Sequence, residues 1–306
     1  MNTIRRISRK TPFLEKIRVR ILRRFLQQRS LLHLSNHPVP MAVMAFDFIG
    51  NEIAINGVYE LNELQGVFEI LKDFETDFAD GTACDIGANI GNHARYFADK
   101  FNKVIAFEPN PLITEILKFN SRPYENIDIF QFALGDFEGT ATIFGDRINI
   151  GGMSISPERT ALNQEFADQD MVGNTIRVRK LDSMQENLGN LQFIKIDVEG
   201  FEHSVIKGAA QTILRLKPVI AFEQWTTDFV NSKSQAINLL TEMGYVFYWQ
   251  TEYSSSNLGL IKYINKYLQA ILGITKIYVQ YSREVPPGHY SMLLAIHETK
   301  TSKLRL

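Results

Sequence analysis

The chain has 306 residues, with 33 Lys and Arg, 34 Asp and Glu, a single Cys and 45% hydrophobic residues. This length allows one large domain or two small ones, and it can bury a core without disulfide bonds. The lone Cys84 excludes a disulfide framework, and no Cys/His cluster has zinc-ligand spacing. No run of about 18 apolar residues occurs, so we expect no transmembrane helix.

The net charge of −1 hides two parts of opposite sign. Residues 1–29 contain ten basic residues and one acid, a net charge of +9, which leaves −10 on the other 277 residues. An acidic body disfavours nucleic acid as its partner.

Residues 1–40 are predicted to be a basic N-terminal helical extension. Thr11 suits an N-cap, Pro12 suits the first helical position, and apolar residues then recur at helical spacing from Leu14 to Phe25. We interpret this stripe as packing on its own domain. In an alternative interpretation, residues 1–29 contact an anionic membrane or a partner protein. A third interpretation is a transit peptide. We therefore expect a cytoplasmic protein, held peripherally at the membrane in the alternative case.

Residues 41–80 are predicted to hold a hairpin and a helix that lead into the core. The hairpin joins residues 41–48 to 52–55 through Gly50-Asn51, and the helix covers 61–74. From residue 81 to 300, short apolar runs alternate with helical stretches, which indicates an α/β domain with a parallel sheet and helices on both faces. The expected strands are 83–86, 104–107, 127–132, 193–196, 219–222, 245–249 and 290–296, with short β pieces at 140–144 and 175–178. Residues 252–289 are an insertion whose amphipathic stretch extends the core or caps the ligand crevice.

The most informative run extends from Cys84 to Asn92 and includes Asp85, Gly87, Asn89 and Gly91. It follows a predicted strand and opens a helix, and its glycines allow a tight turn and a close ligand. The G-x-x-x-G spacing lacks the third glycine of the pyrophosphate-binding motif, and Asp85 would repel a phosphate. An amine and a sulfonium cation, as in S-adenosylmethionine, suit this turn.

Glu108 lies 21 residues after Gly87, at the end of the next predicted strand. A carboxylate there can accept hydrogen bonds from both ribose hydroxyls. A third group, with Lys195, Asp197 and Glu199, lies at the end of a buried strand, where ionisable residues are costly unless used or paired. For Glu202 and His203 we favour a structural role.

Five segments resemble the FkbM family of methyltransferases: DIGANIGNHARYFA (85–98), AFEPNP (106–111), FALGDFEGT (132–140), LDSM (181–184) and IKIDVEGFEHSVIKGA (194–209). The resemblance covers about residues 60–250. It implies a class I methyltransferase with a Rossmann-like, mostly parallel sheet and an antiparallel C-terminal strand. It also implies S-adenosylmethionine as cofactor and, usually, O-methylation in the biosynthesis of polyketides, glycans or other secondary metabolites.

The resemblance assigns roles residue by residue. Asp85, Gly87, Asn89 and Gly91 would hold the methionine end of the cofactor, Glu108 the ribose, and Leu134 and Asp136 would lie beside the adenine. Asp197 and Glu199 would face the methyl donor and the acceptor, and Glu223 would point to the same crevice.

A positioned base would remove the proton of the acceptor hydroxyl. Asp197 is our first choice for that base, with Glu199 or His203 next, while Lys195 holds the acid or the acceptor. We predict no metal site, although a divalent cation bound by these acids is an alternative. A nicotinamide-dependent oxidoreductase and a non-catalytic docking module are the competing functions, and a sugar, glycan or secondary metabolite is the expected acceptor.

Overall fold

A computed structural model describes residues 12–36, 39–45, 47–145, 172–252 and 277–304. The chain divides into two compact units, Met1–Leu61 and Asn62–Leu306. No helix within these described ranges is long and apolar enough to cross a membrane.

The first unit contains two helices, α1 (Phe13–Asn36) and α2 (Phe48–Asn56). The predicted basic helix is therefore present, and it continues eleven residues beyond Phe25. The two helices are joined near their C-terminal ends, where the side chains of Arg29 and His33 both contact the carbonyl oxygen of Ile55. Apolar side chains along α1 are exposed, among them Phe13, Leu14 and Ile21.

The predicted hairpin around Gly50-Asn51 is wrong, because both residues lie inside α2. A glycine fits there because a Cβ atom at Gly50 would lie 2.5 Å from the carbonyl oxygen of Met44. The helix ends at Gly57, whose φ of 86° is favourable for glycine and whose N–H donates to the carbonyl of Ile53. Short apolar runs fit both a strand and a helix, and here the cap at Gly57 and the packing of Gly50 favour the helix.

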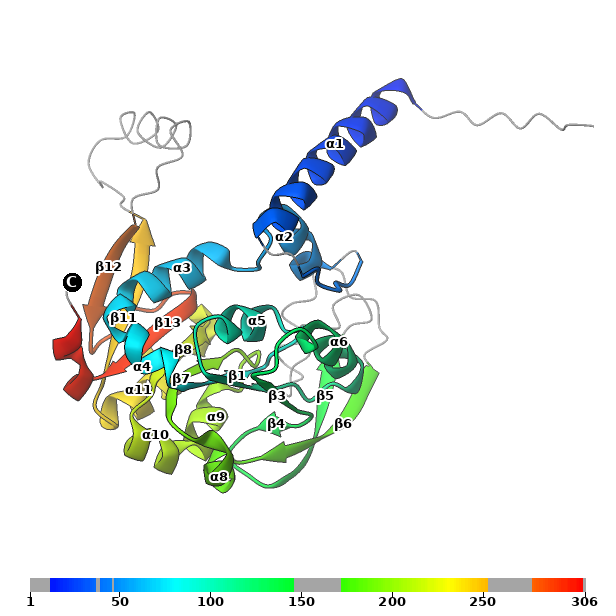
Figure 1. Cartoon of the computed structure of the whole chain (residues 1–306). Helices are drawn as coiled ribbons and strands as arrows, with labels where there is room; N and C mark the ends of the chain where they lie inside the picture. Colours follow the sequence, from blue (N-terminus) through cyan, green and yellow to red (C-terminus); the bar gives the residue numbers. More distant parts are fainter. Residues whose placement is uncertain (1–11, 37–38, 46, 146–171, 253–276, 305–306) are drawn as a thin grey trace, which may run out of the picture. The chain divides into compact units, whose positions relative to one another are not determined.

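The second unit is built on an eight-stranded sheet with the order β12-β11-β13-β8-β7-β1-β2-β3 (Figure 1). Five of its strands are parallel and match the predicted runs, with ends that differ by one or two residues: β1 (Thr82–Ile86), β2 (Lys103–Phe107), β3 (Ile127–Phe130), β7 (Leu191–Ile196) and β8 (Val219–Gln224). Strand β13 (Tyr290–His297) runs antiparallel between β8 and β11 (Tyr245–Glu252). This is the predicted class I arrangement, with its antiparallel C-terminal strand.

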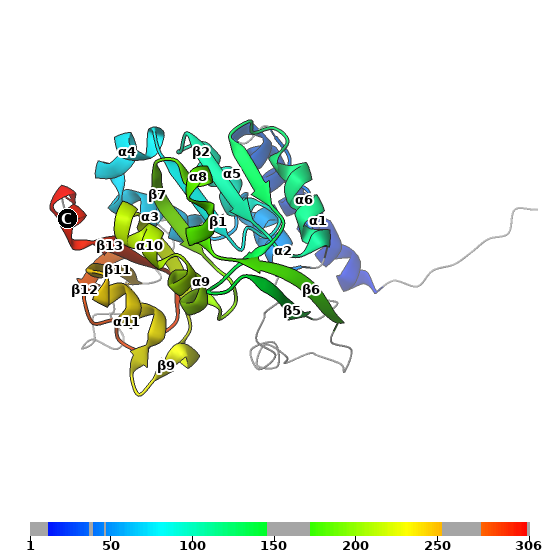
Figure 2. The same ribbon diagram turned by 90° about the horizontal axis from the view of Figure 1, so that it is seen from below.

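Helices cover both faces of the sheet (Figures 1 and 2). One face carries α5 (Asn92–Ala98) and α6 (Pro111–Ser121), and the other carries α9 (Glu202–Gly208), α10 (Ala210–Leu216) and α11 (Gln235–Glu242). The core strands are buried on both sides, which explains their continuous apolar sequences. In the part of the chain that the structure describes, the remaining helical elements are α3 (Leu61–Ile70), η1 (Lys72–Phe74), α4 (Glu75–Ala79), η3 (Leu181–Met184), α8 (Gln185–Leu188), η4 (Thr226–Asp228) and η5 (Glu298–Lys303).

The predicted strand 127–132 ends two residues early, at Phe130. After β3, the chain forms β4 (Ala133–Leu134), which belongs to a separate three-stranded sheet with β5 (Gly139–Gly145) and β6 (Val172–Arg179). The predicted β pieces at 140–144 and 175–178 are these two strands, paired antiparallel. A short pair, β9 (Phe229–Val230) and β10 (Lys233–Ser234), follows β8.

Strand β12 (Ile277–Ser282) was not predicted; it lies inside the predicted insertion and pairs antiparallel with β11. As an edge strand it has partly exposed apolar residues such as Tyr281, so its pattern lacks the buried run of the inner strands. The amphipathic stretch predicted within 252–289 falls on residues 253–276, outside the described part of the chain.

Candidate active site

The candidate site lies where the carboxyl ends of β1, β2, β7 and β8 meet. Strand β1 pairs with β2 on one side and with β7 on the other, so the chain order reverses at β1. Ligands of open α/β sheets bind outside the carboxyl ends of the strands at such a reversal. The predicted site residues Asp85, Glu108, Asp197 and Glu199 all belong to these strand ends.

The glycine turn after β1 is fixed by the neighbouring strands. The N–H groups of Gly87 and Ala88 both donate to the carbonyl of Phe107 at the end of β2. Gly87 has a φ of 81°, and a Cβ atom there would lie 1.9 Å from the carbonyl oxygen of Asp197. Gly91, with a φ of 90°, packs in the same way near Leu117 of α6. The tight turn is confirmed, and in the direction of a side chain both glycines face protein atoms.

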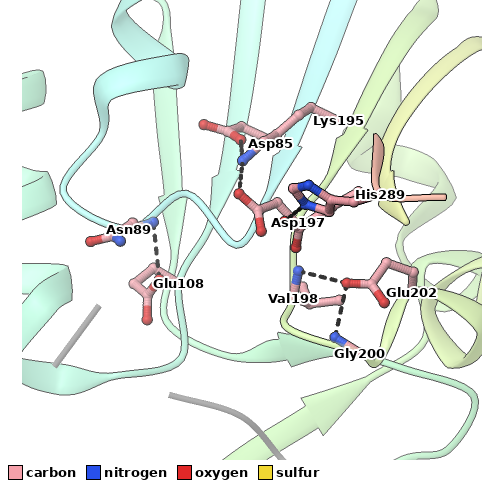
Figure 3. A network of polar contacts seen from close by, with 10 residues as sticks. Asp85, Asn89, Glu108, Lys195, Asp197, Val198, Gly200, Glu202 and His289 are labelled. Atoms are coloured by element: carbon pink, nitrogen blue, oxygen red, sulfur yellow. Dashed lines mark hydrogen bonds and ion pairs between the residues drawn. The ribbon is translucent and has the colours of Figure 1, made fainter. Parts of the chain in front are cut away.

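Glu108 is buried directly after β2 and connects two loops (Figure 3). Its Oε2 accepts from the backbone N–H of Asn89 at 3.0 Å, and its Oε1 accepts from the N–H of Asn110 at 2.8 Å. Burial raises the pKa of Glu108 to about 7, while these two backbone hydrogen bonds act in the opposite direction. Each carboxylate oxygen can still accept a further hydrogen bond.

A buried lysine connects the ends of β1 and β7 (Figure 3). Asp85 and Lys195 are neighbours in the strand register, and their side chains approach to 3.7 Å. The Nζ of Lys195 also donates to Oδ2 of Asp197 at 3.0 Å. Asp85 and Lys195 are nearly inaccessible, whereas the Asp197 side chain is 30% exposed. The lysine therefore holds one oxygen of the partly exposed acid, and a contact between Lys195 and the acceptor stays a prediction.

Asp85 is an under-satisfied buried acid. Neither carboxylate oxygen has a well-aligned hydrogen-bond donor among the described residues, the backbone N–H of Ala94 contributing only weakly. Burial raises the pKa of Asp85, and the charges of Lys195 and His93 oppose that shift. A cationic group near this position would be stabilised by the acid.

The loop after β7 is tied down by Glu202, the first residue of α9. Its Oε1 accepts from the backbone N–H groups of Val198 and Gly200. Between them, Glu199 adopts a φ of 51°, in the left-handed region that side chains rarely occupy. The structural role favoured for Glu202 is confirmed, and it fixes the loop that carries Glu199.

Three other predicted site residues, Leu134, Asp136 and His203, lie in a second group between β4 and α9. Leu134 is buried in the core, and Asp136 accepts from Ser204 at 2.7 Å and from Lys207 at 2.8 Å. The Lys207 hydrogen bond is the main cause of the lowered pKa of Asp136. Burial lowers the pKa of His203, and its charged neighbours are Lys207 and Asp136 rather than Asp197. Asp136 thus anchors α9, and a role for His203 as base stays a prediction.

The contact between the turn after β4 and the end of α9 joins two of the segments that resemble the family, 132–140 and 194–209. A Cβ atom at Gly208 would lie 1.8 Å from the carbonyl oxygen of Gly135, so the Gly135-Asp136 turn and the Lys207-Gly208 turn pack directly together. Ser204 and Lys207 were not singled out in the sequence, although both lie in the segment IKIDVEGFEHSVIKGA.

The strand end of β8 contributes a group that the sequence analysis only partly identified. Glu223 is largely buried, and its Oε1 lies 3.4 Å from Nε2 of His289, in the loop between β12 and β13. The rings of His289 and Trp225 are 4.4 Å apart with an interplanar angle of 35°. Burial, followed by the charges of Asp197 and Glu199, raises the pKa of Glu223 to about 9. Glu223 had been placed at this crevice, whereas no sequence pattern indicated His289 or Trp225.

Within the described ranges, no group of three or more His, Cys, Asp or Glu residues could hold a metal ion.

The model of the methyltransferase FkbM domain matches residues 85–247, which is more than half of the chain. The chain belongs to the FkbM methyltransferase family. The matched region begins at Asp85 and contains every predicted site residue, from the glycine turn to the acids after β7. This FkbM methyltransferase therefore has its candidate site in the part of the chain that defines the family.

Two curated relatives are also methyltransferases. Hexuronic acid methyltransferase AglP of Haloferax volcanii is 26% identical over 171 residues, which cover 55% of this chain and 66% of AglP. Methyltransferase sdnD of Sordaria araneosa is 24% identical over 221 residues, which cover 61% of this chain and 85% of sdnD. The match to AglP thus spans just under two thirds of that protein.

Solved structures similar to this FkbM methyltransferase include methyltransferase FkbM from Methylobacillus flagellatus, with 18% identity and a TM-score of 0.37 over 72% of this chain and 44% of the other. A SAM-dependent O-methyltransferase from Thermotoga maritima matches with 12% identity and a TM-score of 0.38 over 87% and 69% of the two chains.

Proposed function

We propose that this methyltransferase transfers the methyl group of S-adenosylmethionine to a hydroxyl oxygen of a sugar, glycan or secondary metabolite. The observation that carries the proposal is the placement of Glu108. Its carboxylate lies at the end of β2 and accepts from two backbone N–H groups, that of Asn89 in the glycine turn after β1 and that of Asn110. This is the position in which an acid accepts the two ribose hydroxyls of a nucleoside ligand in this class of sheet.

The other donor-side residues fit the same cofactor. The buried carboxylate of Asp85 lacks a well-aligned hydrogen-bond donor, and burial raises its pKa although the Lys195 ammonium lies 3.7 Å away, so a second cation nearby would further favour its ionised form. S-adenosylmethionine supplies two cationic groups, an ammonium and a sulfonium, and the sulfonium makes its methyl group transferable. We assign Asp85, Gly87, Asn89 and Gly91 to the methionine end and Glu108 to the ribose.

On the acceptor side, Asp197 is the acid that an acceptor can reach. Its side chain is partly exposed, and Lys195 fixes one of its oxygens at 3.0 Å. We assign Asp197 as the base that accepts the proton of an acceptor hydroxyl, and a positioned base of this kind accelerates a reaction by roughly 10²–10⁴-fold. Alignment of acceptor and donor by the loops after β1 and β7 contributes a larger part of the catalysis.

The proposed acceptor class draws on the relatives. AglP is named as a hexuronic acid methyltransferase, so a family relative acts on a sugar. Methyl transfer is favoured over the nicotinamide-dependent alternative, because the family is a methyltransferase family and the glycine turn lacks the dinucleotide spacing.

Titration calorimetry with S-adenosylhomocysteine tests the donor site directly. Wild-type protein is expected to bind, and Glu108→Gln is expected to weaken binding roughly ten- to hundredfold, since hydrogen bonds to a charged group contribute about 1.5–3 kcal/mol. Glu115→Gln, an exposed carboxylate on α6, is the matched control and should leave the affinity unchanged. Absence of binding by the wild type, or equal loss in both variants, would contradict the proposal.

A further inference from the structure

The loop between β12 and β13 places a histidine at the strand ends of the site. His289 is 48% exposed, and its Nε2 lies 3.4 Å from Oε1 of Glu223, whose side chain is 14% exposed. Electrostatic interactions of Glu223 with Asp197 and Glu199 show that this pair belongs to the same region as the acids after β7. His289 therefore reaches the proposed acceptor side from a segment 92 residues further along the chain than Asp197.

The imidazole is held in one orientation from several directions. Its ring packs against Trp225 at 4.4 Å, and the backbone N–H of Trp225 is fixed by a hydrogen bond to Asp228. The loop itself is anchored by the buried side chain of Val285 and by a hydrogen bond of 2.8 Å from the Tyr290 hydroxyl to the carbonyl of Pro286. A side chain that is partly exposed and yet oriented in this way is suited to bind a ligand.

The chemistry around His289 indicates what its second nitrogen does. Glu223 lies 3.4 Å from Nε2, and burial with the charges of Asp197 and Glu199 raises its pKa, so the protonated carboxyl is favoured and can donate to Nε2. An imidazole that accepts at Nε2 carries its own hydrogen on Nδ1. Asp197 and Glu199, as carboxylates, offer only acceptors, so His289 supplies a donor that these acids lack.

We propose that His289 is an acceptor-binding residue whose Nδ1–H donates a hydrogen bond to an oxygen of the substrate. This oxygen neighbours the substrate hydroxyl whose proton Asp197 accepts. The substrate class that satisfies both groups is a polyol with neighbouring oxygens, one donating to Asp197 and the next accepting from His289. Glu223 is the positioning residue that sets the tautomer, and Trp225 supports the ring. This inference rests on the proposed function and adds the acceptor side to it.

The test uses labelled methyl transfer from S-adenosylmethionine to an extract of a source strain that lacks this gene, because that extract contains the unmethylated acceptor. His289→Phe keeps a ring against Trp225 and removes both nitrogens. We expect the acceptor KM, measured by extract dilution, to rise roughly tenfold, the effect of one lost hydrogen bond to a ligand. The KM for S-adenosylmethionine and the affinity for S-adenosylhomocysteine should stay unchanged.

Three further variants separate a binding role from a structural one. His289→Asn restores an amide donor and should recover part of the acceptor affinity. Glu223→Gln, whose amide can also donate to Nε2, should retain it, whereas Glu223→Met should behave like His289→Phe. Arg283→Gln, an exposed residue of the same loop that pairs with Glu298, is the control and should match the wild type.

The outcomes distinguish this inference from the proposed function. A wild type that labels nothing and does not bind S-adenosylhomocysteine contradicts the proposed function. An active wild type with an unchanged acceptor KM in His289→Phe overturns the role of His289 alone. The role of His289 is also overturned if His289→Phe loses S-adenosylhomocysteine binding or thermal stability together with acceptor affinity, because the effect would then be structural.

Discussion

The two sides of the site are built in different ways. The proposed donor side uses the turn after β1 and Glu108 after β2, two consecutive strand ends separated by a single helix. Its groups are fixed largely by backbone hydrogen bonds, such as those from Asn89 and Asn110 to Glu108. The acceptor side combines Asp197, Glu223 and His289 from three separate parts of the chain, and these groups are fixed by side-chain contacts.

This difference shows which part of a methyltransferase site is free to vary. A donor side made of backbone contacts needs a short, fixed sequence, because the turn geometry and the glycines leave little room for change. An acceptor side made of side chains on separate loops can change its residues without changing the sheet. We therefore expect substrate choice to depend on the proposed acceptor side, including the loop that carries His289.

The largest expected effect comes from Gly87, a residue at which the two sides touch. Gly87→Ala places a Cβ atom against the carbonyl oxygen of Asp197 and forces a side chain into a φ of 81°. We expect the free energy of unfolding to fall by roughly 2–6 kcal/mol from strain and overpacking, with loss of donor binding. Denaturant unfolding and titration calorimetry would measure both.

Gly189→Ala is the matched control for this substitution. Gly189 also has a positive φ, of 52°, but a Cβ atom there would meet only the Thr82 hydroxyl at an ordinary 3.5 Å. The free energy of unfolding of Gly189→Ala should fall only by the strain contribution of about 1–3 kcal/mol, and its affinity for S-adenosylhomocysteine should be unchanged. If both variants lost equal stability, the contact between Gly87 and Asp197 would not link the two sides.

A smaller effect, confined to the donor side, is a pH dependence through Glu108. The pKa of its carboxyl is about 7 in the folded protein, and only the ionised form offers acceptors to both ribose hydroxyls. Affinity for S-adenosylhomocysteine should therefore fall about tenfold per pH unit below pH 7 and level off above it. Calorimetry between pH 5.5 and about pH 8.5 would measure the profile.

The same group has a predictable influence on stability. Its folded pKa of about 7 lies above the ordinary value of 4.5, so the folded state holds the proton more tightly than the unfolded state. The contribution of Glu108 to stability is therefore largest below pH 4.5 and is lost as the pH rises to 7. Glu108→Gln should remove both dependences, and a Glu108→Gln protein with the wild-type pH profile would refute the assignment.

The smallest expected effect on either side comes from the basic helix α1. Arg18→Glu combined with Arg24→Glu should leave the affinity for S-adenosylhomocysteine unchanged, because α1 belongs to the separate unit Met1–Leu61. If residues 1–29 contact an anionic membrane, this pair should weaken sedimentation with phosphatidylglycerol vesicles by tenfold or more, at about 1 kcal/mol per charge. Lys72→Glu combined with Lys118→Glu is the control for net charge, since both lysines are on the other unit. Equal sedimentation of all three proteins would favour packing of the α1 stripe on protein instead.

The fold was predictable where burial leaves a strong pattern. Parallel strands such as β1 and β7 are covered on both faces, so each is a short apolar run that only a few arrangements accommodate. The edge strand β12 lacks such a run, and helix α2 was mistaken for a hairpin because Gly50-Asn51 between apolar residues fits both structures. In both places the sequence pattern is weak, and neighbouring elements decide the conformation.

The proposed donor residues could be located for the same local reason. Asp85, Gly87 and Glu108 take their roles from positions relative to strand ends, and these positions can be counted along the chain. The resemblance also placed Asp136 near the cofactor, where the structure shows both of its carboxylate oxygens bound by α9. A role in anchoring that helix could not be read from spacing, because its partners lie 68 and 71 residues away.

The sequence by itself determined the class of sheet, the glycine turn, the strand-end acids and the resemblance to FkbM methyltransferases. Only the tertiary structure decided that Lys195 bridges Asp85 and Asp197, that Gly87 packs on the carbonyl of Asp197, and that His289 meets Glu223. The physical reason is the separation along the chain of the residues that interact. Turns and buried strands are set by neighbours within a few residues, whereas these contacts form when parallel strands and the loop after β12 are brought to one edge of the sheet.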